Sequence, residues 1–242
     1  MKPQTLLALL GSASVAQAHL VAFAAWVNGV DQGTANNAPS YVRVHPGNNP
    51  IQDVTSPNMK CNLNGDAPAA KTVKAMPGDK ITIEWHHESR APTDDIIADS
   101  HKGPIQVYLA PTASNGNGNV WVKVASETLN NGVWAVDNLI KNKGKHEFVM
   151  PKDLAPGKYL VRPEIIALHG ASVVGQAQFY MECLQFEVGG QGTTPLPAGV
   201  PFPGAYKATD PGVKYDLYTK PKPSRAADYT APGPAVWEGA SA

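Results

Sequence analysis

The sequence predicts an all-β protein, an antiparallel sandwich of the immunoglobulin or fibronectin type with long loops and an extended C-terminal arm. Short segments in which apolar and polar residues alternate recur along the chain, and Gly, Pro and Asn separate them. That pattern is typical of antiparallel strands. No long amphipathic helix is indicated, and about seven such segments joined by loops favour a β-sandwich.

The strands are expected where the alternation is clearest. Residues 80–85 read Lys-Ile-Thr-Ile-Glu-Trp after the turn sequence Pro-Gly-Asp at 77–79, which predicts a half-buried strand. Further strands are expected at residues 20–27, 105–110, 121–124, 147–150, 158–167 and 178–188. Short helical pieces are expected only at residues 94–99 and 126–130.

The composition changes from Gly189 onward, where Pro and Gly become frequent and no helix is expected. A disordered linker is one interpretation of such a tail. The tail also carries several aromatic residues, more than a solvated linker usually has: Tyr206, Tyr215, Tyr218, Tyr229 and Trp237. We therefore expect an ordered, extended arm that wraps over the sandwich.

The first residues indicate secretion. Lys2 is followed by an apolar run and then by small residues that end in Ala16-Gln17-Ala18, the pattern of a secretory signal peptide over residues 1–18. The run is far shorter than the roughly 20 residues that a membrane-spanning helix needs, so no membrane anchor is expected. Residues 19–242 are expected to form one catalytic domain, secreted and extracellular.

The charge balance limits the expected partners, and the cysteines indicate the redox state. The 20 basic residues equal the 20 acidic ones, so no bulk field attracts nucleic acid or anionic lipid, and an uncharged partner is expected. The only two cysteines are Cys61 and Cys183, which a secreted protein usually joins, the alternative being two free thiols. A loop of this size contributes about 4–5 kcal/mol in the chain-entropy account. The protein is expected to be a monomer.

Cleavage after Ala18 would make His19 the first residue of the mature chain. Its free amine and its imidazole can then chelate one metal ion, because an amine with a pKa near ~7.7–8.0 releases its proton at mild pH. One more imidazole would give three nitrogen donors. Such a tetragonal set with open positions suits Cu(II) better than zinc or the oxygen-seeking cations. The alternative is that His at the cleavage point is a coincidence.

His101 is the leading candidate for the second imidazole. It lies in a loop that feeds directly into the strand expected at 105–110, and loops at strand ends are where sites are built. The alternative is an ordinary surface histidine. His86 and His87 are adjacent, and consecutive strand residues point to opposite faces, so they are not expected to share a metal. We expect one of them to be partly buried and the other exposed.

The segment 178–183 places Gln178 and Tyr180 on one face of a strand, with Phe179, Met181 and Cys183 on the other. A phenol and an amide therefore project together, although Tyr180 could equally be a core residue whose hydroxyl finds a partner. His169 ends the preceding segment and leads into this strand through a Gly-containing turn, which favours a position at the same end.

At these residues the chain resembles the fungal lytic polysaccharide monooxygenases of auxiliary-activity family nine, formerly classed as a glycoside hydrolase family. The resemblance spans essentially the whole mature chain and rests on motifs in a fixed order. They are His19 after the signal peptide, His-Lys-Gly-Pro at 101–104, Trp-Ala-Val-Asp at 134–137, Pro-Gly-Lys-Tyr-Leu-Val-Arg at 156–162, Ile-Ile-Ala-Leu-His at 165–169, Gln-Phe-Tyr-Met-Glu-Cys at 178–183, Ala-Thr-Asp-Pro-Gly at 208–212 and Tyr-Thr-Ala-Pro-Gly-Pro at 229–234.

The resemblance implies a role for each matching residue. It implies that His19 and His101 hold one copper ion as a histidine brace and that Tyr180 caps the metal axially. His169 and Gln178 would act beside the metal on the bound oxygen species, and such partners tune a metal's reactivity. Cys61 and Cys183 match the family's long-range disulfide. Departures at Pro163, where many relatives have His, and at Leu20 remove no ligand.

The resemblance also implies the reaction. Such an enzyme is reduced by an external donor, which is a small-molecule reductant or cellobiose dehydrogenase. It then uses O2 or H2O2 to oxidise cellulose or a related β-1,4-glucan beside the glycosidic bond. Crystalline cellulose cannot enter a cleft, so the metal must be carried on a flat face. Aromatic rings can lie against sugars, and Tyr215 is expected to make one such contact. The alternative is that Tyr215 packs the arm onto the sandwich.

Two rival functions are considered. A hydrolase needs a catalytic carboxylate pair, but Glu84 and Glu182 are expected on polar strand faces, and Glu164 alone suggests orientation or charge balance. The other rival is a noncatalytic secreted copper- or carbohydrate-binding sandwich, since fold does not establish function. The presence of His169, Gln178 and Tyr180 argues for reactivity, because copper storage requires no oxygen-orienting residues.

Overall fold

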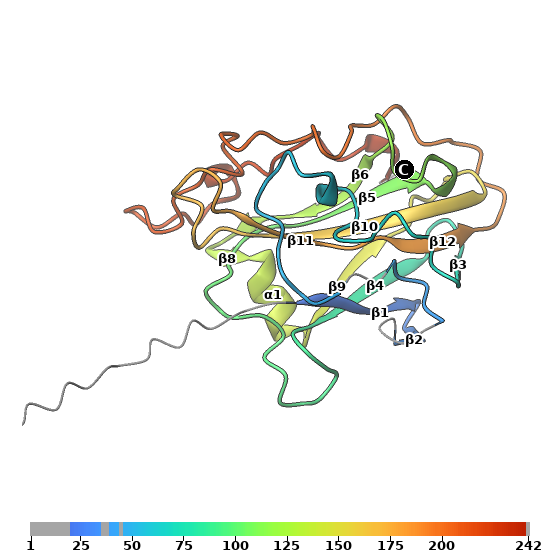
Figure 1. Ribbon diagram of the computed structural model, residues 1–242, viewed down its shortest axis with the longest axis horizontal. Coiled ribbons are helices and arrows are strands. Elements are labelled where there is room, and N and C mark those ends of the chain that lie inside the picture. The colour runs from blue at the N-terminus through green and yellow to red at the C-terminus, as the bar shows by residue number, and fades with distance from the viewer. Residues whose placement is uncertain (1–19, 35–38, 44–45, 241–242) are drawn as a thin grey trace, which may run out of the picture.

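The computed structural model describes residues 20–34, 39–43 and 46–240, and its centre is formed by two β-sheets packed face to face (Figure 1). The expected signal peptide at 1–18 and His19 lie outside the described residues. No helix among the described residues is long and apolar enough to cross a bilayer.

The smaller sheet has four antiparallel strands in the order β2–β1–β4–β9. The larger sheet has six, with β3–β12–β10–β5–β6 in order and β11 paired to the far part of β10; only β3 and β12 run parallel. The strand bounds are β1 (Val21–Val27), β2 (Val30–Thr34), β3 (Val73–Ala75), β4 (Lys80–His86), β5 (Ile105–Pro111), β6 (Val122–Glu127), β9 (Lys145–Val149), β10 (Gly157–Ala167), β11 (Gln178–Met181) and β12 (Leu184–Val188).

Small elements join the sheets. A hairpin of β7 (Leu129–Asn130) and β8 (Val133–Trp134) leads directly into α1 (Ala135–Lys141), the one α-helix of the described chain. Single turns of 3-10 helix are η1 (Pro57–Met59), η2 (Thr112–Ser114), η3 (Ala226–Asp228) and η4 (Glu238–Ala240).

The larger sheet is buried on both faces. Its inner face packs against the smaller sheet through one apolar cluster, which includes Ile83, Val161 and Phe186. Its outer face lies under a second cluster, to which the C-terminal arm contributes Phe202 and Tyr206. With both faces covered, every residue of β10 from Tyr159 to Ala167 is buried, including the charged Arg162 and Glu164.

The expected C-terminal arm is confirmed. Much of the segment 189–240 runs across the outer face of the larger sheet (Figure 1), and Tyr206 and Tyr229 are 4% and 5% exposed. The Lys123 ammonium of β6 donates to the Pro232 carbonyl of the arm at 2.8 Å. Tyr218, at 60% exposed, is the aromatic of the arm that remains at the surface. Apolar burial therefore holds this irregular segment in place.

The long strand expected at 178–188 is instead two strands. Both pair with β10, since Met181 lies opposite Glu164 and Leu184 lies opposite Val161. The pairing is interrupted between these points, where β10 carries Pro163. Proline has no N–H to donate to a ladder, so the neighbouring strand breaks there. The Cys61–Cys183 disulfide, present as expected, is made at this break.

The helices expected at residues 94–99 and 126–130 are wrong. Residues 126–130 belong to β6 and β7. Residues 94–99 form turns around the Asp94 carboxylate, which accepts hydrogen bonds from the backbone N–H groups of His87, Glu88, Ser89 and Ile96. These bonds hold the pKa of Asp94 at about 2 in spite of its burial. A side chain that organises the backbone in this way competes with helix formation.

The half-buried character expected for β4 is also wrong, as is the expected polar-face position of two glutamates. Glu84 is 5% exposed, because Trp26 donates its indole N–H to the carboxylate at 2.6 Å and Arg90 and His86 pair with it. Glu182 is 2% exposed and accepts the Ala22 amide at 2.6 Å. Both carboxylates are buried with partners rather than placed on a solvated face.

Candidate metal centre

His101 lies in an irregular segment that is held beside the end of β10. The Leu168 amide donates to the Lys102 carbonyl at 2.9 Å, and the Ile166 amide donates to the Pro104 carbonyl at 3.2 Å. Gly103 permits this approach, because a Cβ there would lie 1.8 Å from the Ile166 carbonyl oxygen. The segment is thereby positioned by backbone contacts before any metal binds.

This placement brings His101 to His169. Their ring centroids are 4.1 Å apart with an interplanar angle of 38°. The ring of Tyr180 lies 6.2 Å from that of His101. His169 and Tyr180 therefore lie at the same end of the sandwich, as expected, and the ring of His101 lies near both of them.

The predicted alternation of β11 is confirmed as well. The Tyr180 hydroxyl donates to Gln178 Oε1 at 2.7 Å, so the two side chains share one face. Phe179, Met181 and Cys183 belong instead to the cluster under the arm. The register of β11 on β10, with Tyr180 opposite Ile165, sets how far this face lies from His169.

Burial shifts the pKa of two groups in this cluster. It raises the pKa of the Tyr180 phenol well above its usual range, so the phenol stays protonated. It lowers the pKa of the His169 imidazole, which favours the neutral ring. His169 Nδ1 is buried and has no hydrogen-bond partner among the described residues. His101 is 5% exposed and its Nδ1 lies 3.2 Å from Ser100 Oγ.

The donor types fit a nitrogen-preferring metal. His101, His169 and Tyr180 offer imidazole nitrogen and phenol oxygen, whereas Ca²⁺ and Mg²⁺ are bound chiefly by carboxylates, carbonyls and water. Within residues 20–34, 39–43 and 46–240, no group of three or more His, Cys, Asp or Glu side chains is placed to hold a metal. His19, from which two nitrogens are expected, is not in that range.

His86 and His87 point to different partners, as expected. The buried His86 lies between two carboxylates, 2.8 Å from Glu84 and 3.4 Å from Asp94. His87, whose side chain is 23% exposed, pairs with Asp95 at 2.8 Å. The carboxylate partners explain both rings without a shared metal.

Tyr215 is partly buried and packs the arm onto the sandwich. Its ring meets those of Trp134 and Tyr229 edge-on, at centroid distances of 5.9 and 5.0 Å, and its hydroxyl donates to the Asp228 carbonyl at 3.1 Å. The packing alternative is therefore what the structure shows. A sugar contact by the exposed part of the ring stays a prediction.

Sequence reasoning missed the ion pairs that hold the His101 segment from its other side. The Lys102 ammonium pairs with the carboxylates of Asp99 and Asp137, and Asp137 also accepts the Trp134 amide at the start of α1. Lys102 and Asp137 both stand in motifs that carry the family resemblance, but nothing in their spacing indicates that their side chains pair. The pairing follows from the tertiary fold.

Glu164 lies in the interior of the protein. It is 0% exposed, pairs with the equally buried Arg162 at 2.6 Å and accepts the Tyr206 hydroxyl at 2.6 Å. Arg162 donates in turn to the carbonyls of Met59 and Lys60. The charge-balance interpretation of Glu164 is confirmed.

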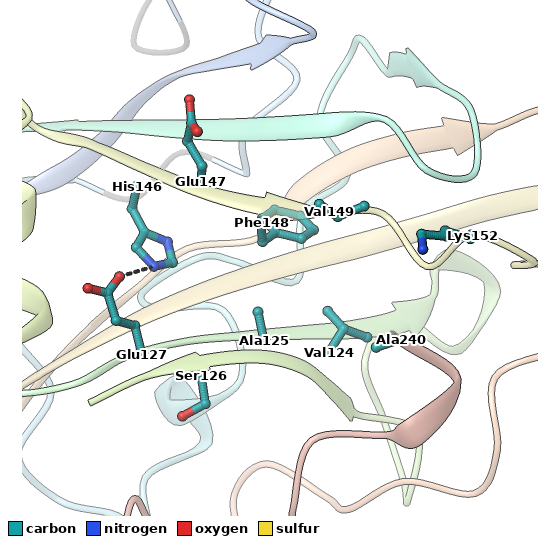
Figure 2. A pocket seen from close by; sticks show the side chains of 10 residues that line it. All are labelled: Val124, Ala125, Ser126, Glu127, His146, Glu147, Phe148, Val149, Lys152 and Ala240. Carbon is teal, nitrogen blue, oxygen red and sulfur yellow. Dashed lines mark ion pairs between the residues drawn. The ribbon is translucent and has the colours of Figure 1, made fainter. Parts of the chain in front are cut away.

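A separate pocket lies between β6 and β9, the edge strands of the two sheets (Figure 2). Its cavity is about 390 Å³, and His146 Nε2 lies 3.3 Å from Glu127 Oε2 within it. Figure 2 shows that Glu147 points away from this pair. None of the predicted site residues lines the pocket, so it marks the open flank of the sandwich.

Together, the fold and the cluster define a β-sandwich protein with a candidate nitrogen-rich metal centre at one end. The family model of Auxiliary Activity family 9, formerly GH61, matches residues 19–229. The chain therefore belongs to Auxiliary Activity family 9.

Individual relatives agree with this assignment. The chain is 58% identical over 237 residues to the AA9 family lytic polysaccharide monooxygenase A of Aspergillus clavatus, a match that covers 98% of this chain and 65% of that protein. The chain thus spans slightly less than two thirds of that relative's length. The solved structure of CvAA9A matches with a TM-score of 0.84 at 40% identity, over 91% of this chain and 99% of that one.

A crystal structure of a cellulose-active polysaccharide monooxygenase from M. thermophila matches with a TM-score of 0.73 at 27% identity, over 90% of this chain and 99% of that one. These matches confirm both the predicted β-sandwich and the resemblance stated from the motifs.

Proposed function

We propose that this chain is a secreted, copper-dependent lytic polysaccharide monooxygenase that cleaves β-1,4-glucan, chiefly cellulose, with O2 or H2O2 and an external reductant. The observation that carries the proposal is that His101, His169 and Tyr180 come together from three separate segments. Membership of a monooxygenase family supports the same reaction class.

In this proposal His101 and the amine and imidazole of His19 would hold one copper ion, and Tyr180 would offer its phenol oxygen to the same ion. When bound, copper supplies the one-electron redox chemistry by which a C–H bond beside the glycosidic linkage is oxidised. Burial raises the pKa of the Tyr180 phenol, which favours a weak, neutral oxygen donor there. This leaves the nitrogen donors to dominate the metal's environment, as copper prefers.

The part assigned to His19 rests on the sequence and on where β1 begins. The Ala22 amide donates to the carboxylate of Glu182, two residues beyond Tyr180. An extended chain covers about 3.3–3.6 Å per residue, so a residue three positions before Ala22 has the reach to approach Tyr180.

His169 and Gln178 are proposed to bind and orient the oxygen co-substrate. The neutral His169 ring is buried beside His101, and its Nδ1 has no partner within the described chain. Gln178 uses its carbonyl oxygen to accept the Tyr180 hydroxyl, which leaves its NH2 group able to donate. The two side chains can therefore hold an oxygen species without adding charge.

The proposed substrate is a flat, uncharged surface, and the proposed electron donor is a small reductant or cellobiose dehydrogenase. Tyr215 is proposed to contact a sugar ring with the exposed part of its own ring. Secretion through the signal peptide at 1–18 would expose the protein to the extracellular polysaccharide. Cleavage of this signal peptide would also free the His19 amine.

The test is a product analysis. The mature, copper-loaded protein is incubated with swollen cellulose, with and without ascorbate, and the soluble products are identified by mass spectrometry. The proposal expects aldonic acids or 4-keto sugars only when ascorbate is present. Unoxidised oligosaccharides formed without ascorbate would show a hydrolase, and no soluble product would show a binding protein.

Matched variants sharpen the test. His101→Ala should abolish both oxidised products and the nitrogen-rich cupric signal in paramagnetic resonance. His87→Ala serves as the control, because His87 pairs with Asp95 outside the cluster, and it should keep both. One extra residue before His19 should abolish activity while the protein stays folded. Full activity of that extended protein would contradict chelation by the His19 amine.

A further inference from the structure

The turn between β10 and β11 carries exposed apolar side chains that nothing in the fold requires. Val173 and Val174 are 61% and 46% exposed, and they are the one adjacent pair of large exposed apolar residues in the described chain. Exposed turns favour Gly, Asn, Asp and Ser. Since these valines bury little against the protein itself, another surface must explain them.

The turn is held in place at both ends. The Ala171 amide donates to the Leu168 carbonyl at 3.0 Å, and the Gln176 amide donates to the Val173 carbonyl at 3.1 Å. The Tyr215 amide of the arm donates to the Ala171 carbonyl at 2.8 Å. The valines are therefore presented by a braced turn, and a partner that binds them does not have to order the chain first.

The position of the turn identifies the surface to which it belongs. It begins directly after His169 and ends at Gln178, two residues of the candidate site. Figure 1 shows the connection between β10 and β11 at the same end of the sandwich as β8 and the arm segment beyond residue 210. A large flat object lying over the cluster would meet this turn.

The chemistry of the turn restricts the partner. Residues 170–178 contain no charged side chain. Packed chains in crystalline β-glucan present the C–H faces of their sugar rings as an apolar, uncharged plane. A single soluble chain is flexible and hydrated, and it offers a smaller area to two neighbouring aliphatic side chains.

We propose that Val173 and Val174 form an aliphatic contact that seats the candidate site on the packed chain face of crystalline β-glucan. The proposal rests on the function proposed above and adds a determinant of substrate form. The pair favours crystalline substrate over soluble oligosaccharide, because only an extended apolar plane covers both side chains at once.

The test compares two double variants of equal chemistry. Val173→Ser/Val174→Ser removes the contact, and Val30→Ser/Val149→Ser is the control, since those valines are 63% and 46% exposed on the smaller sheet. Adsorption isotherms on crystalline cellulose give the dissociation constants. The first variant should bind about tenfold more weakly than the parent, and the control should match the parent. Oxidation of soluble cello-oligosaccharides should be equal in all three.

Unchanged adsorption of Val173→Ser/Val174→Ser would overturn the contact, and so would equal weakening of both variants. An equal loss of activity on soluble oligosaccharide and on crystals would overturn the claim that the pair selects the substrate form. If the parent adsorbs but forms no oxidised sugar, the proposed monooxygenase function fails. Selective weakening of the first variant would still support the contact.

Discussion

Glu164→Gln should destabilise the protein severely but leave the activity per folded molecule unchanged. Glu164 and Arg162 are both 0% exposed and pair at 2.6 Å. The change keeps the size of the side chain but leaves the Arg162 charge buried beside a neutral amide. Removing one partner of a buried ion pair costs about 3–5 kcal/mol.

The surroundings of Glu164 set where in that range the cost falls. Its carboxylate also accepts the hydroxyl of Tyr206 at 2.6 Å and the amide of Gln106 at 3.3 Å. Both bonds go to Oε1, whereas Arg162 donates to Oε2. A glutamine oxygen can therefore keep either those two bonds or the Arg162 bond, and each net hydrogen bond is worth about 1 kcal/mol. We therefore expect a loss of about 4 kcal/mol, a large part of the stability of an ordinary domain.

The assay is guanidinium unfolding at neutral pH, followed by fluorescence and circular dichroism so that coincident transitions support a two-state analysis. Glu147→Gln is the control. Its salt bridge to Lys80 at 3.0 Å joins side chains that are each 51% exposed, and removing such a surface pair should cost at most about 1 kcal/mol.

The double variant Arg162→Met/Glu164→Leu separates the charge effect from packing. With no orphaned charge, it should be more stable than the sum of the two single changes predicts. A cost below about 1 kcal/mol for Glu164→Gln, or strict additivity in the cycle, would refute the reasoning. Activity per folded molecule should be unchanged in Glu164→Gln, whereas a hydrolase using this carboxylate would lose it.

Three further predictions concern other parts of the fold. Burial lowers the pKa of Lys123 to about 8, so above that pH the folded state binds fewer protons than the unfolded state. The free energy of unfolding should therefore rise from pH 8 to about 9.5. Lys123→Met should abolish this rise, as measured by the unfolding midpoints. Replacing Cys61 and Cys183 by Ala should cost about 4–5 kcal/mol in calorimetry, and an unchanged melting temperature would refute this. Asp137→Asn, which keeps an oxygen for the start of α1 but weakens the pair with Lys102, should lower copper affinity about tenfold in titration calorimetry, whereas Asp137→Glu should restore most of it.

Much of the candidate site follows from local rules. The period of two in β11 places Gln178 and Tyr180 on one face, and their hydrogen bond of 2.7 Å confirms it. The same period keeps His86 and His87 on separate partners. These predictions need only the geometry of one strand, which the order of residues determines.

Other features could not be predicted, because they depend on which segments pack together. Alternation identified β4 as a strand, but the burial of Glu84 depends on Trp26 and Arg90, which come from elsewhere in the chain. Helix α1 has seven residues, too few for a periodic signal. The break between β11 and β12 depends on their pairing with β10 opposite Pro163.

The sequence by itself determined the strand-rich class, the ordered aromatic arm, the cysteine pair and the residue types of the candidate metal centre. The tertiary structure alone decided that the rings of His101 and His169 lie 4.1 Å apart, that Lys102 pairs with Asp137, and that Val173 and Val174 stay exposed. The physical reason is range. Side-chain direction along a strand is set by bonds between neighbouring residues, whereas the meeting of distant segments depends on strand pairing and on the burial of apolar surface across the whole chain.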